Sequence, residues 1–555
     1  MTFITNLWET NRPMMILLMI LIVVIPFIVF YVIKARKEHP KGLIAAALSN
    51  MGERFGYYIM NAVLLLFLCS KFGISDDVAG WIYAVFYFLI YVLSLPGGLI
   101  ADRTRSFKGT IIAGLVVMAL GYGMLSVPVF AESSGISWVL IFTCVALFII
   151  AFGNGLFKGN LQALVGQMYD NFEAEAAKKG PEALAKAKSK RDVGFQIFYV
   201  FINIGGVIAP FIAPLLRSFW LNAHALTYNA DLPRLCHLFL DNRAGMTAED
   251  MDNLNKLATE VGHTGVVDAT FCSEYLNIFN TGVHFSFIAS VIAMLVSLLI
   301  FVLIKKKLPN PIKKDKATVV SYTPEEKVAK AKEIKQRLYA LFAVLGVAVF
   351  FWFSFHQNGQ SLSVFARDFV ATDAIPPEIW QCINPLFVIL LTPVIMFIFG
   401  ALAKRNKEVS TPRKIVIGMF LAACAYIFLA VIAIANNYPS GEEFRSFSEA
   451  VKIAMKTSPM VLILTYFFLT VAELFISPLG LSFVSKIAPL HLQGICQGLW
   501  LTATAIGNLF IAIGVTMLNT FPDQWMCWAV FALFCLISMG VMLGMVKWLE
   551  RVTKA

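Results

Sequence analysis

Long apolar segments recur along the whole chain and are separated by shorter polar stretches. An α-helix needs about 20 apolar residues to cross a hydrocarbon core about 30 Å thick. The pattern predicts twelve membrane-spanning helices, at residues 43–68, 78–100, 110–129, 137–165, 193–215, 283–304, 338–356, 380–403, 415–434, 461–487, 499–518 and 525–548. We therefore expect an all-α integral membrane protein.

A polar stretch at 305–337 separates the first six spans from the last six. It holds eleven Lys or Arg residues against four Asp or Glu residues, and its second part, 325–337, is typical of a surface helix. Net basic segments also follow the second, eighth and twelfth spans, at 102–108, 404–414 and 551–554. Loops rich in Lys and Arg stay in the cytoplasm, so the linker and the C-terminus are expected there. The predicted units are an N-terminal bundle at 42–304, a cytoplasmic linker at 305–337 and a C-terminal bundle at 338–555.

A further apolar segment, Met14 to Ile33, precedes the twelve spans. Basic residues follow it, and it has neither a basic leader nor a small-residue cleavage site, so a cleaved signal peptide is not expected. We interpret residues 1–41 as an extra N-terminal helix and its linker, kinked at Pro26, packed at the periphery with the N-terminus outside. A helix that lies on the membrane surface is the alternative.

The loop at 216–282 differs in charge from the other connections. It holds eight acidic and four basic residues, which predicts an extracytoplasmic cap. Cys236 and Cys272 both lie in this loop, where a disulfide can form. Sequence alone does not establish that pairing.

Composition agrees with a membrane protein and excludes several classes. Hydrophobic residues make up 59% of the chain and charged residues 14%, against about 25% charged in soluble domains. The net charge of +11 suits loops that face an anionic leaflet, whereas nucleic acid is a poor partner for such a chain. The nine cysteines show no metal-binding spacing.

Ionisable residues inside the predicted spans are few. Those that we single out are Glu53, Arg54, Lys158, His356 and Glu473. A charge in a membrane is costly and marks a functional site by default, and these residues come from both halves, as expected for a cavity between two bundles. Buried ion pairs that only fix the packing are the alternative interpretation.

Short motifs around these residues support a specific family resemblance. The run from Asn50 to Tyr58 (NMGERFGYY) resembles the ExxERFxYY signature of the proton-coupled oligopeptide transporter family, within the major facilitator superfamily. Further similar elements follow in the family's order: GGLIADR at 97–103, FKGN at 157–160, FYVFINIG at 198–205, FW at 351–352 with Gln357, QCINP at 381–385, ELFISPLGLS at 473–482, and Trp500. The extra N-terminal helix and the 216–282 loop lie outside the match.

The resemblance implies a peptide-binding cavity. Arg54 and Lys158 would bind the substrate carboxylate, Arg by a planar fork, and Glu473 would bind the ammonium with Asn384 beside it. Amide contacts and cavity walls would come from the remaining expected site residues: Asn160, Asn203, Tyr57, Tyr58, Tyr91 and Trp500. These asparagines have an alternative role in joining helices, and aromatic residues are common in the chain. No metal or organic cofactor is implied, and the proton would be the coupling ion.

The chain departs from the family pattern at three positions. Asn50 stands where the family has the first glutamate of its signature, and Asn61 and His356 stand where the family has an arginine and an acidic residue that close the outer gate. An Asn–His pair can still close through a hydrogen bond, and a histidine can titrate near neutral pH. A neutral histidine satisfied by a neighbour is the alternative.

The expected inner gate and coupling follow from the residues that are kept. Family members close the cytoplasmic side partly through a lysine–glutamate contact, which would be Lys158 with Glu473 here. Glu53 is adjacent to Arg54, so Glu473 is the better proton site, with His356 and Glu53 as further candidates for coupling.

The sequence therefore predicts a secondary active transporter that imports di- and tripeptides by proton symport across a bacterial inner membrane, functional as a monomer. A carrier with another small zwitterionic or anionic substrate, or an uncoupled facilitator, is the alternative. A nucleotide-driven pump lacks the required phosphate loop, and no constellation typical of an enzyme stands out. A transporter-like receptor would be distinguished only by measured uptake.

Overall fold

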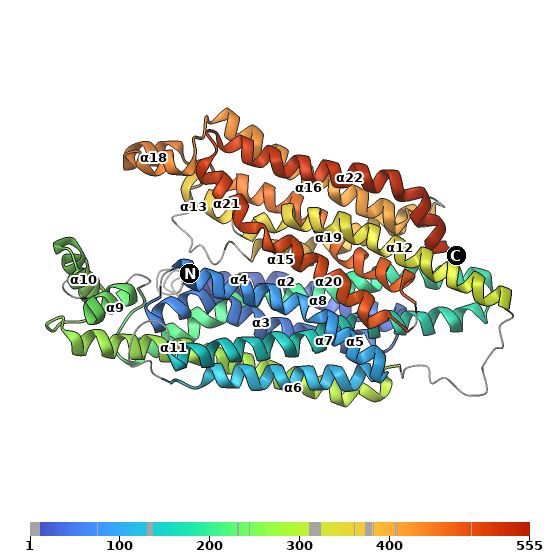
Figure 1. Cartoon of the computed structure of the whole chain (residues 1–555), viewed down its shortest axis with the longest axis horizontal. Helices are drawn as coiled ribbons and strands as arrows, with labels where there is room; N and C mark the ends of the chain where they lie inside the picture. Colours follow the sequence, from blue (N-terminus) through green and yellow to red (C-terminus); the bar gives the residue numbers. More distant parts are fainter. Residues whose placement is uncertain are drawn as a thin grey trace.

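The computed structural model describes residues 12–74, 76–129, 137–229, 232–242, 245–309, 324–359, 361–371, 380, 382–405, 407, 409–489 and 491–554. In these parts of the chain, thirteen helices are long and apolar enough to cross a membrane. The first is α2 (Arg12–Glu38), and the other spans form two bundles side by side (Figure 1). The predicted all-helical membrane architecture with an extra N-terminal helix is confirmed.

The two bundles follow each other in sequence. The N-terminal bundle contains α3 (Leu43–Phe72), α4 (Asp76–Val92), α5 (Ser94–Thr104), α6 (Phe107–Ser126), α7 (Trp138–Ala177), α8 (Pro181–Ala223) and α11 (Ala269–Ile304). The C-terminal bundle contains α12 (Pro324–Phe355), α15 (Ile383–Lys404), α16 (Thr411–Ala435), α19 (Met460–Ile487), α20 (Gln493–Leu509), α21 (Ile511–Thr520) and α22 (Gln524–Lys554). Shorter helices lie in the connections between the long ones: α9 (Leu232–Asn242), α10 (Ala248–Glu260), η2 (Lys305–Lys307), η4 (His356–Gly359), α13 (Ser361–Phe369), α17 (Gly441–Ser446) and α18 (Glu449–Met455).

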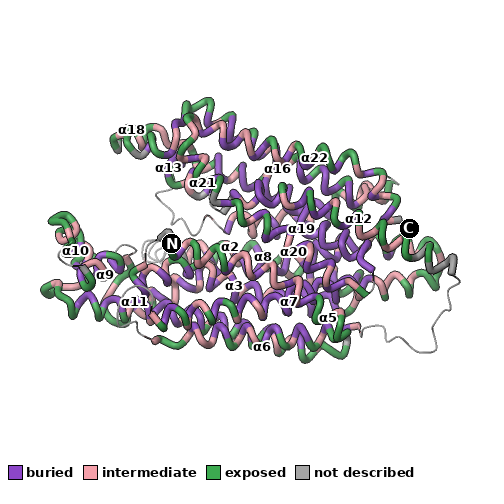
Figure 2. Tube along the Cα trace, viewed as in Figure 1, coloured by how far each residue is buried: buried purple, intermediate pink, exposed green. Residues whose placement is uncertain are grey.

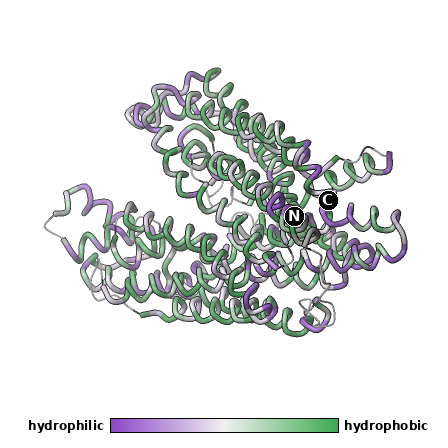
Figure 3. The backbone as a smooth tube through the Cα atoms, turned by 45° about the vertical axis from the view of Figure 1, so that its right-hand side comes forward, coloured by the Kyte–Doolittle hydropathy of each residue, from purple (hydrophilic) through white to green (hydrophobic). Residues whose placement is uncertain are grey.

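The molecule has two distinct ends. We call the end that carries α9 and α10 the cap end, and the opposite end, where α5 and α22 finish, the basic end. Figure 1 shows the bundles diverging toward the cap end and converging toward the basic end. Buried residues are concentrated where the bundles converge (Figure 2). Apolar residues line the middle of the helices and polar residues gather at their ends (Figure 3), as expected for a protein immersed in lipid.

Several helices continue beyond the predicted spans, because hydropathy marks where side chains become polar, not where a helix ends. The fourth and fifth spans, predicted at 137–165 and 193–215, belong to α7 and α8, which continue well beyond the apolar segments. Gly180, with φ of 117°, makes the turn between them, and Pro181 starts α8. The predicted surface helix at 325–337 is continuous with the seventh span as α12.

Two other spans are interrupted. The second span is divided between α4 and α5 at Leu93, and the eleventh between α20 and α21 at Phe510. The predicted 216–282 loop is also shorter than expected, because α8 runs to Ala223 and α11 begins at Ala269. The cap consists of α9 and α10 together with their connections.

The predicted Cys236–Cys272 disulfide is not formed in the structure. Both residues are buried free thiols. They are neighbours, since a hydrogen bond with Cys272, together with burial, raises the pKa of the Cys236 thiol well above its usual value. The two thiols are therefore neighbours, with Cys236 on α9 of the cap and Cys272 on the first turn of α11, and no covalent bond joins them.

Candidate substrate-binding site

A cavity of about 210 Å³ lies between the two bundles. The N-terminal bundle contributes Arg54, Tyr58, Tyr87, Tyr91, Lys158, Gln162, Tyr199 and Ile202. The C-terminal bundle, with η4, contributes Trp352, Phe355, His356, Asn384, Glu473, Ser477, Leu481, Trp500, Leu501 and Thr504. Eight of the expected site residues thus share one cavity: Arg54, Tyr58, Tyr91, Lys158, His356, Asn384, Glu473 and Trp500.

Arg54 reaches the cavity as half of a buried ion pair. Its Nε and a terminal nitrogen donate to the two carboxylate oxygens of Glu53, at 2.6 and 2.7 Å. The Asn154 amide donates to the same carboxylate at 2.6 Å, and the Tyr57 ring lies 4.6 Å from the guanidinium carbon. These contacts hold Arg54 in place and compensate its charge, so the Glu53–Arg54 pair is close to neutral as a unit.

Lys158 is the second cation of the cavity. Its ammonium lies 4.2 Å from the centre of the Tyr91 ring, a cation–π contact. None of the ion pairs found among the described residues joins Lys158 to Glu473. The expected Lys158–Glu473 contact is therefore absent from this conformation, and the Lys158 ammonium group lies against the Tyr91 ring at the cavity wall.

Glu473, on α19 of the opposite bundle, is held by neutral donors. The Tyr199 hydroxyl donates to one carboxylate oxygen, and the Asn384 amide donates to the other at 2.8 Å. Asn384 also donates to the Thr470 hydroxyl at 3.1 Å. The contact from Tyr199 crosses the interface between the bundles, which places the carboxylate at that interface.

Aromatic residues form the remaining walls. The His356 ring stacks on Trp352, with ring centres 4.9 Å apart. Trp500 packs against Gly480, where an added Cβ would lie 2.2 Å from the indole ring. A side chain at position 480 would thus displace Trp500, which explains the glycine in that motif.

Some expected site residues do not line this cavity. Asn160 donates instead to the backbone oxygens of Gly97 and Leu156, which joins α7 to α5, and Asn203 donates to the Tyr199 carbonyl in its own helix. Both side chains donate to backbone oxygens in this conformation and neither lines the cavity, so their role as substrate contacts stays a prediction. Tyr57 and Glu53 lie behind Arg54.

The two expected outer-gate residues contact different partners and not each other in this conformation. Asn61 accepts a hydrogen bond from Tyr83 at 2.8 Å, within the N-terminal bundle, whereas His356 stacks on Trp352. This agrees with the divergence of the bundles toward the cap end.

Sequence reasoning missed several neighbours of the charged residues. Tyr199 and Trp352 stood inside recognised motifs but were not singled out, and Asn154 had no motif. Tyr87 lies one helical turn before Tyr91, and this spacing on one helix face was the available signal.

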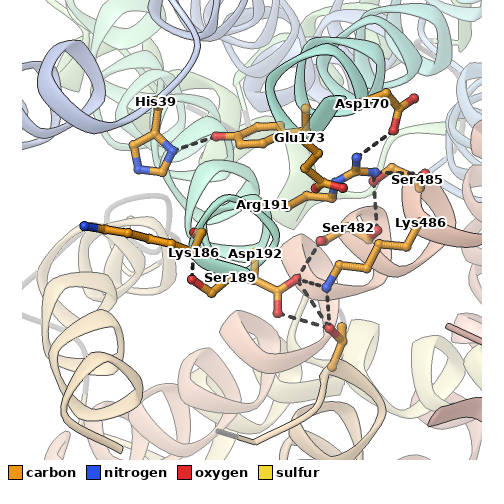
Figure 4. Close-up of polar contacts among 12 residues, drawn as sticks. His39, Asp170, Glu173, Lys186, Ser189, Arg191, Asp192, Ser482, Ser485 and Lys486 are labelled. Carbon is orange, nitrogen blue, oxygen red and sulfur yellow. Dashed lines mark hydrogen bonds and ion pairs between the residues drawn. The ribbon is translucent and has the colours of Figure 1, made fainter. Parts of the chain in front are cut away.

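The basic end is closed by a buried network around Asp192 of α8 (Figure 4). Its carboxylate accepts hydrogen bonds from Lys486 at 2.7 Å, Ser482 at 2.6 Å, Lys414 at 3.1 Å and Thr411 at 3.0 Å. All four partners belong to the C-terminal bundle. Hydropathy does not predict this network, because Asp192 meets its partners only when α8 extends beyond the apolar segment.

Neighbouring contacts strengthen the same closure. Arg191 pairs with Asp170 at 2.6 Å and Glu173 at 2.8 Å, and it donates to the Ser485 carbonyl of α19 at 3.1 Å. Asp170 also accepts a hydrogen bond from Gln493 at 2.8 Å.

Close backbone contact between α5 and α20 completes this end. The Asp102 carboxylate accepts from the backbone amides of Gly494 and Ile495, at 3.1 and 2.8 Å, and so caps α20. A Cβ on Gly98 would lie 2.3 Å from the Gly494 carbonyl oxygen. Only glycine permits this approach, which is typical of tightly packed membrane helices.

Comparison with known proteins identifies the family. A sequence model described as the POT family matches residues 108–323 and 312–529. This chain belongs to the POT family. The family membership confirms the resemblance found in the sequence.

Among relatives of this POT protein is a protein named dipeptide and tripeptide permease B from Edwardsiella piscicida. It is 28% identical over 540 residues, which cover 93% of this chain and 96% of the relative. The peptide transporter YePEPT of Yersinia enterocolitica is also 28% identical, over 85% of this chain and 86% of its own length. A crystal structure of a peptide transporter POT in complex with sulfate superposes with a TM-score of 0.57 at 21% identity, covering 93% of this chain and 96% of that one. That structural similarity supports the fold.

Proposed function

We propose that this protein imports di- and tripeptides across a bacterial inner membrane by alternating access, with protons as the coupling ion. The basic end faces the cytoplasm, because Lys and Arg gather there, and the cap faces outside. The structure then corresponds to a state closed toward the cytoplasm. The names of the two permease and transporter relatives support peptides as the substrate class.

One observation carries this proposal: opposite charges from opposite bundles face a single cavity without forming an ion pair. The Lys158 ammonium on α7 lies over the Tyr91 ring, and Glu473 on α19 accepts hydrogen bonds from the neutral donors Tyr199 and Asn384. Because Glu53 compensates Arg54, the cavity has one positive and one negative pole. A zwitterionic peptide matches this arrangement, its carboxylate at Lys158 and Arg54 and its ammonium at Glu473.

Substrate and proton act on one switch in this proposal. An ionised Glu473 can bind a peptide ammonium or attract Lys158 across the cavity, and a protonated Glu473 loses its attraction for both. The basic end is closed without the expected Lys158–Glu473 contact, so the Asp192 network holds it closed in this conformation. Each ligand thus has a different affinity for the two states, which is the requirement for shifting their equilibrium.

Glu473 is the favoured proton site, because Asn50 has no titratable group and Glu53 is already bound by other side chains. Asn50 cannot titrate, and Glu53 is tied to Arg54 and Asn154 by three short contacts. His356 is a second candidate, in the position where the family has an acid.

Uptake of labelled di- and tripeptides into proteoliposomes, with and without an inward proton gradient, tests the proposal. We expect accumulation in the wild type and its loss in Lys158→Ala and Glu473→Gln. Glu550→Gln is a matched control, since it removes a carboxylate that pairs with Arg413 inside one bundle. Normal accumulation by folded Lys158→Ala or Glu473→Gln protein would refute the site.

The same assay separates the coupling mechanisms. If wild-type uptake only equilibrates the peptide under every gradient, the protein is an uncoupled facilitator. If accumulation survives in Glu473→Gln but disappears in His356→Gln, the proton site is His356. Competition by a small zwitterion that is not a peptide, without any peptide uptake, would instead indicate another substrate.

A further inference from the structure

The extra helix α2 contacts both bundles. It packs against α8 and α3 of the N-terminal bundle and against α15 of the C-terminal bundle. Leu17 lies in an apolar cluster with Phe211 of α8 and Cys382, the residue before α15. Residues such as Ile22 and Val29 are exposed on its other face, where lipid is expected. In Figure 1, α2 lies along the region where α8 and α15 meet.

The contact with α15 supplies a hydrogen-bond donor that α15 lacks. Pro393 lies inside α15 and has no backbone N–H, so it cannot bond the carbonyl four residues earlier, that of Ile389. The fully buried Tyr31 of α2 donates its hydroxyl to this Ile389 oxygen at 2.7 Å. A carbonyl left free by proline in a membrane helix needs a partner from a neighbouring helix. Tyr31 supplies it from outside the two bundles.

The basic end of α2 is attached to the N-terminal bundle. Lys190 of α8 donates to the Glu38 carbonyl at 3.1 Å, and the His39 ring hydrogen-bonds the Tyr169 hydroxyl of α7 at 2.7 Å. Figure 4 shows His39 beside the α7–α8 region that closes the basic end. α2 is thus anchored on one bundle while Tyr31 bonds the other.

We propose that α2 is a strap across the two bundles and that Tyr31 is a positioning residue for α15. This inference rests on the proposed alternating access. When the bundles move, α15 moves relative to α8, so a helix anchored to α7 and α8 cannot keep the same bond to Ile389. The Tyr31 hydroxyl therefore stabilises the state that is open at the cap end, and it helps to place Asn384, which lies on α15 beside Glu473.

A double-mutant cycle in the full chain tests this role. Tyr31→Phe removes only the hydroxyl, and Pro393→Ala restores a backbone N–H that can bond Ile389. Spin labels at two exposed cap-end positions, Phe219 on α8 and Ile453 on α18, report the separation of the bundles without substrate. The partly exposed thiols Cys69, Cys144 and Cys424 are replaced by serine first.

We expect Tyr31→Phe to lower the ratio of cap-open to cap-closed molecules by about tenfold, because a buried carbonyl loses its donor. In the Pro393→Ala background the same change should alter the ratio by less than about twofold. Tyr426→Phe is the matched control: it removes a buried tyrosine hydroxyl from the Ser354 carbonyl, but both residues lie in the C-terminal bundle. It should leave the ratio unchanged.

Three results would overturn the strap: no shift with Tyr31→Phe, an equal shift in both backgrounds, or an equal shift with Tyr426→Phe. Gel filtration of each variant checks its fold before labelling. Because the distances are measured without substrate, failure of the peptide assay leaves this test intact. The strap and the substrate class can thus fail separately.

Discussion

Asp192→Asn tests the closure of the basic end most directly. In the wild type, the buried Asp192 carboxylate accepts hydrogen bonds from two lysines, a serine and a threonine of the opposite bundle. The substitution keeps the shape but removes the charge. Lys414 and Lys486 then remain near the closed interface without their counter-charge, whereas in the opened state water can solvate them. The substitution therefore raises the free energy of the closed state relative to the open state.

The size of the effect follows from burial. Removing one partner of a buried ion pair costs about 3–5 kcal/mol. The side chains of Asp192 and Lys414 are 11% and 9% exposed, but that of Lys486 is 23% exposed and keeps part of its hydration. We therefore expect about 2–3 kcal/mol, which shifts the ratio of open to closed molecules at the basic end by about 30- to 150-fold.

Distances between spin labels at Lys188 of α8 and Lys404 of α15, both exposed at the basic end, measure that ratio. We expect the long-distance population to grow in Asp192→Asn. Glu550→Gln is again the control, because its partners Ser410 and Arg413 lie in its own bundle. A change in the ratio of less than about threefold, or an equal change in the control, would show that the Asp192 network does not hold the bundles together.

Three further predictions concern other sites. Arg54→Ala should weaken peptide affinity by at least about tenfold, because it removes a charge-assisted contact; calorimetry with peptides and their carboxamides checks this, and strictly additive losses would contradict a direct contact. Mild oxidation should join Cys236 to Cys272, and mass spectrometry that finds both thiols free afterwards would contradict their proximity. Burial, with nearby Lys190 and Lys34, lowers the pKa of His39 to about 4, so the unfolded chain takes up the proton first. The contribution of His39 to stability is therefore fully present above about pH 6.5 and is lost, up to about 3 kcal/mol, as the pH falls from about 6.5 to 4; thermal unfolding should show a smaller loss over this range in His39→Gln than in the wild type.

The charged part of the site could be predicted, while much of its surroundings could not. Arg54, Lys158 and Glu473 stand out because a charge inside an apolar span is rare and costly. Tyr199 and Tyr87 do not stand out, since a tyrosine in a membrane helix is equally suited to lipid, core or cavity. The backbone contacts of Asn160 and Asn203 could not be predicted, because a sequence does not say which neighbour an amide will meet.

The sequence by itself determined the number of spans, their division into two bundles and the family. These features depend on hydropathy and local motifs, which each segment carries independently of its partners. Only the tertiary structure decided which distant groups meet. Asp192 meets Lys486 because α8 continues past the apolar segment, and Tyr31 meets Ile389 because α2 packs against both bundles. Such contacts depend on helix lengths, crossing positions and the conformational state, and these arise only when the whole chain packs.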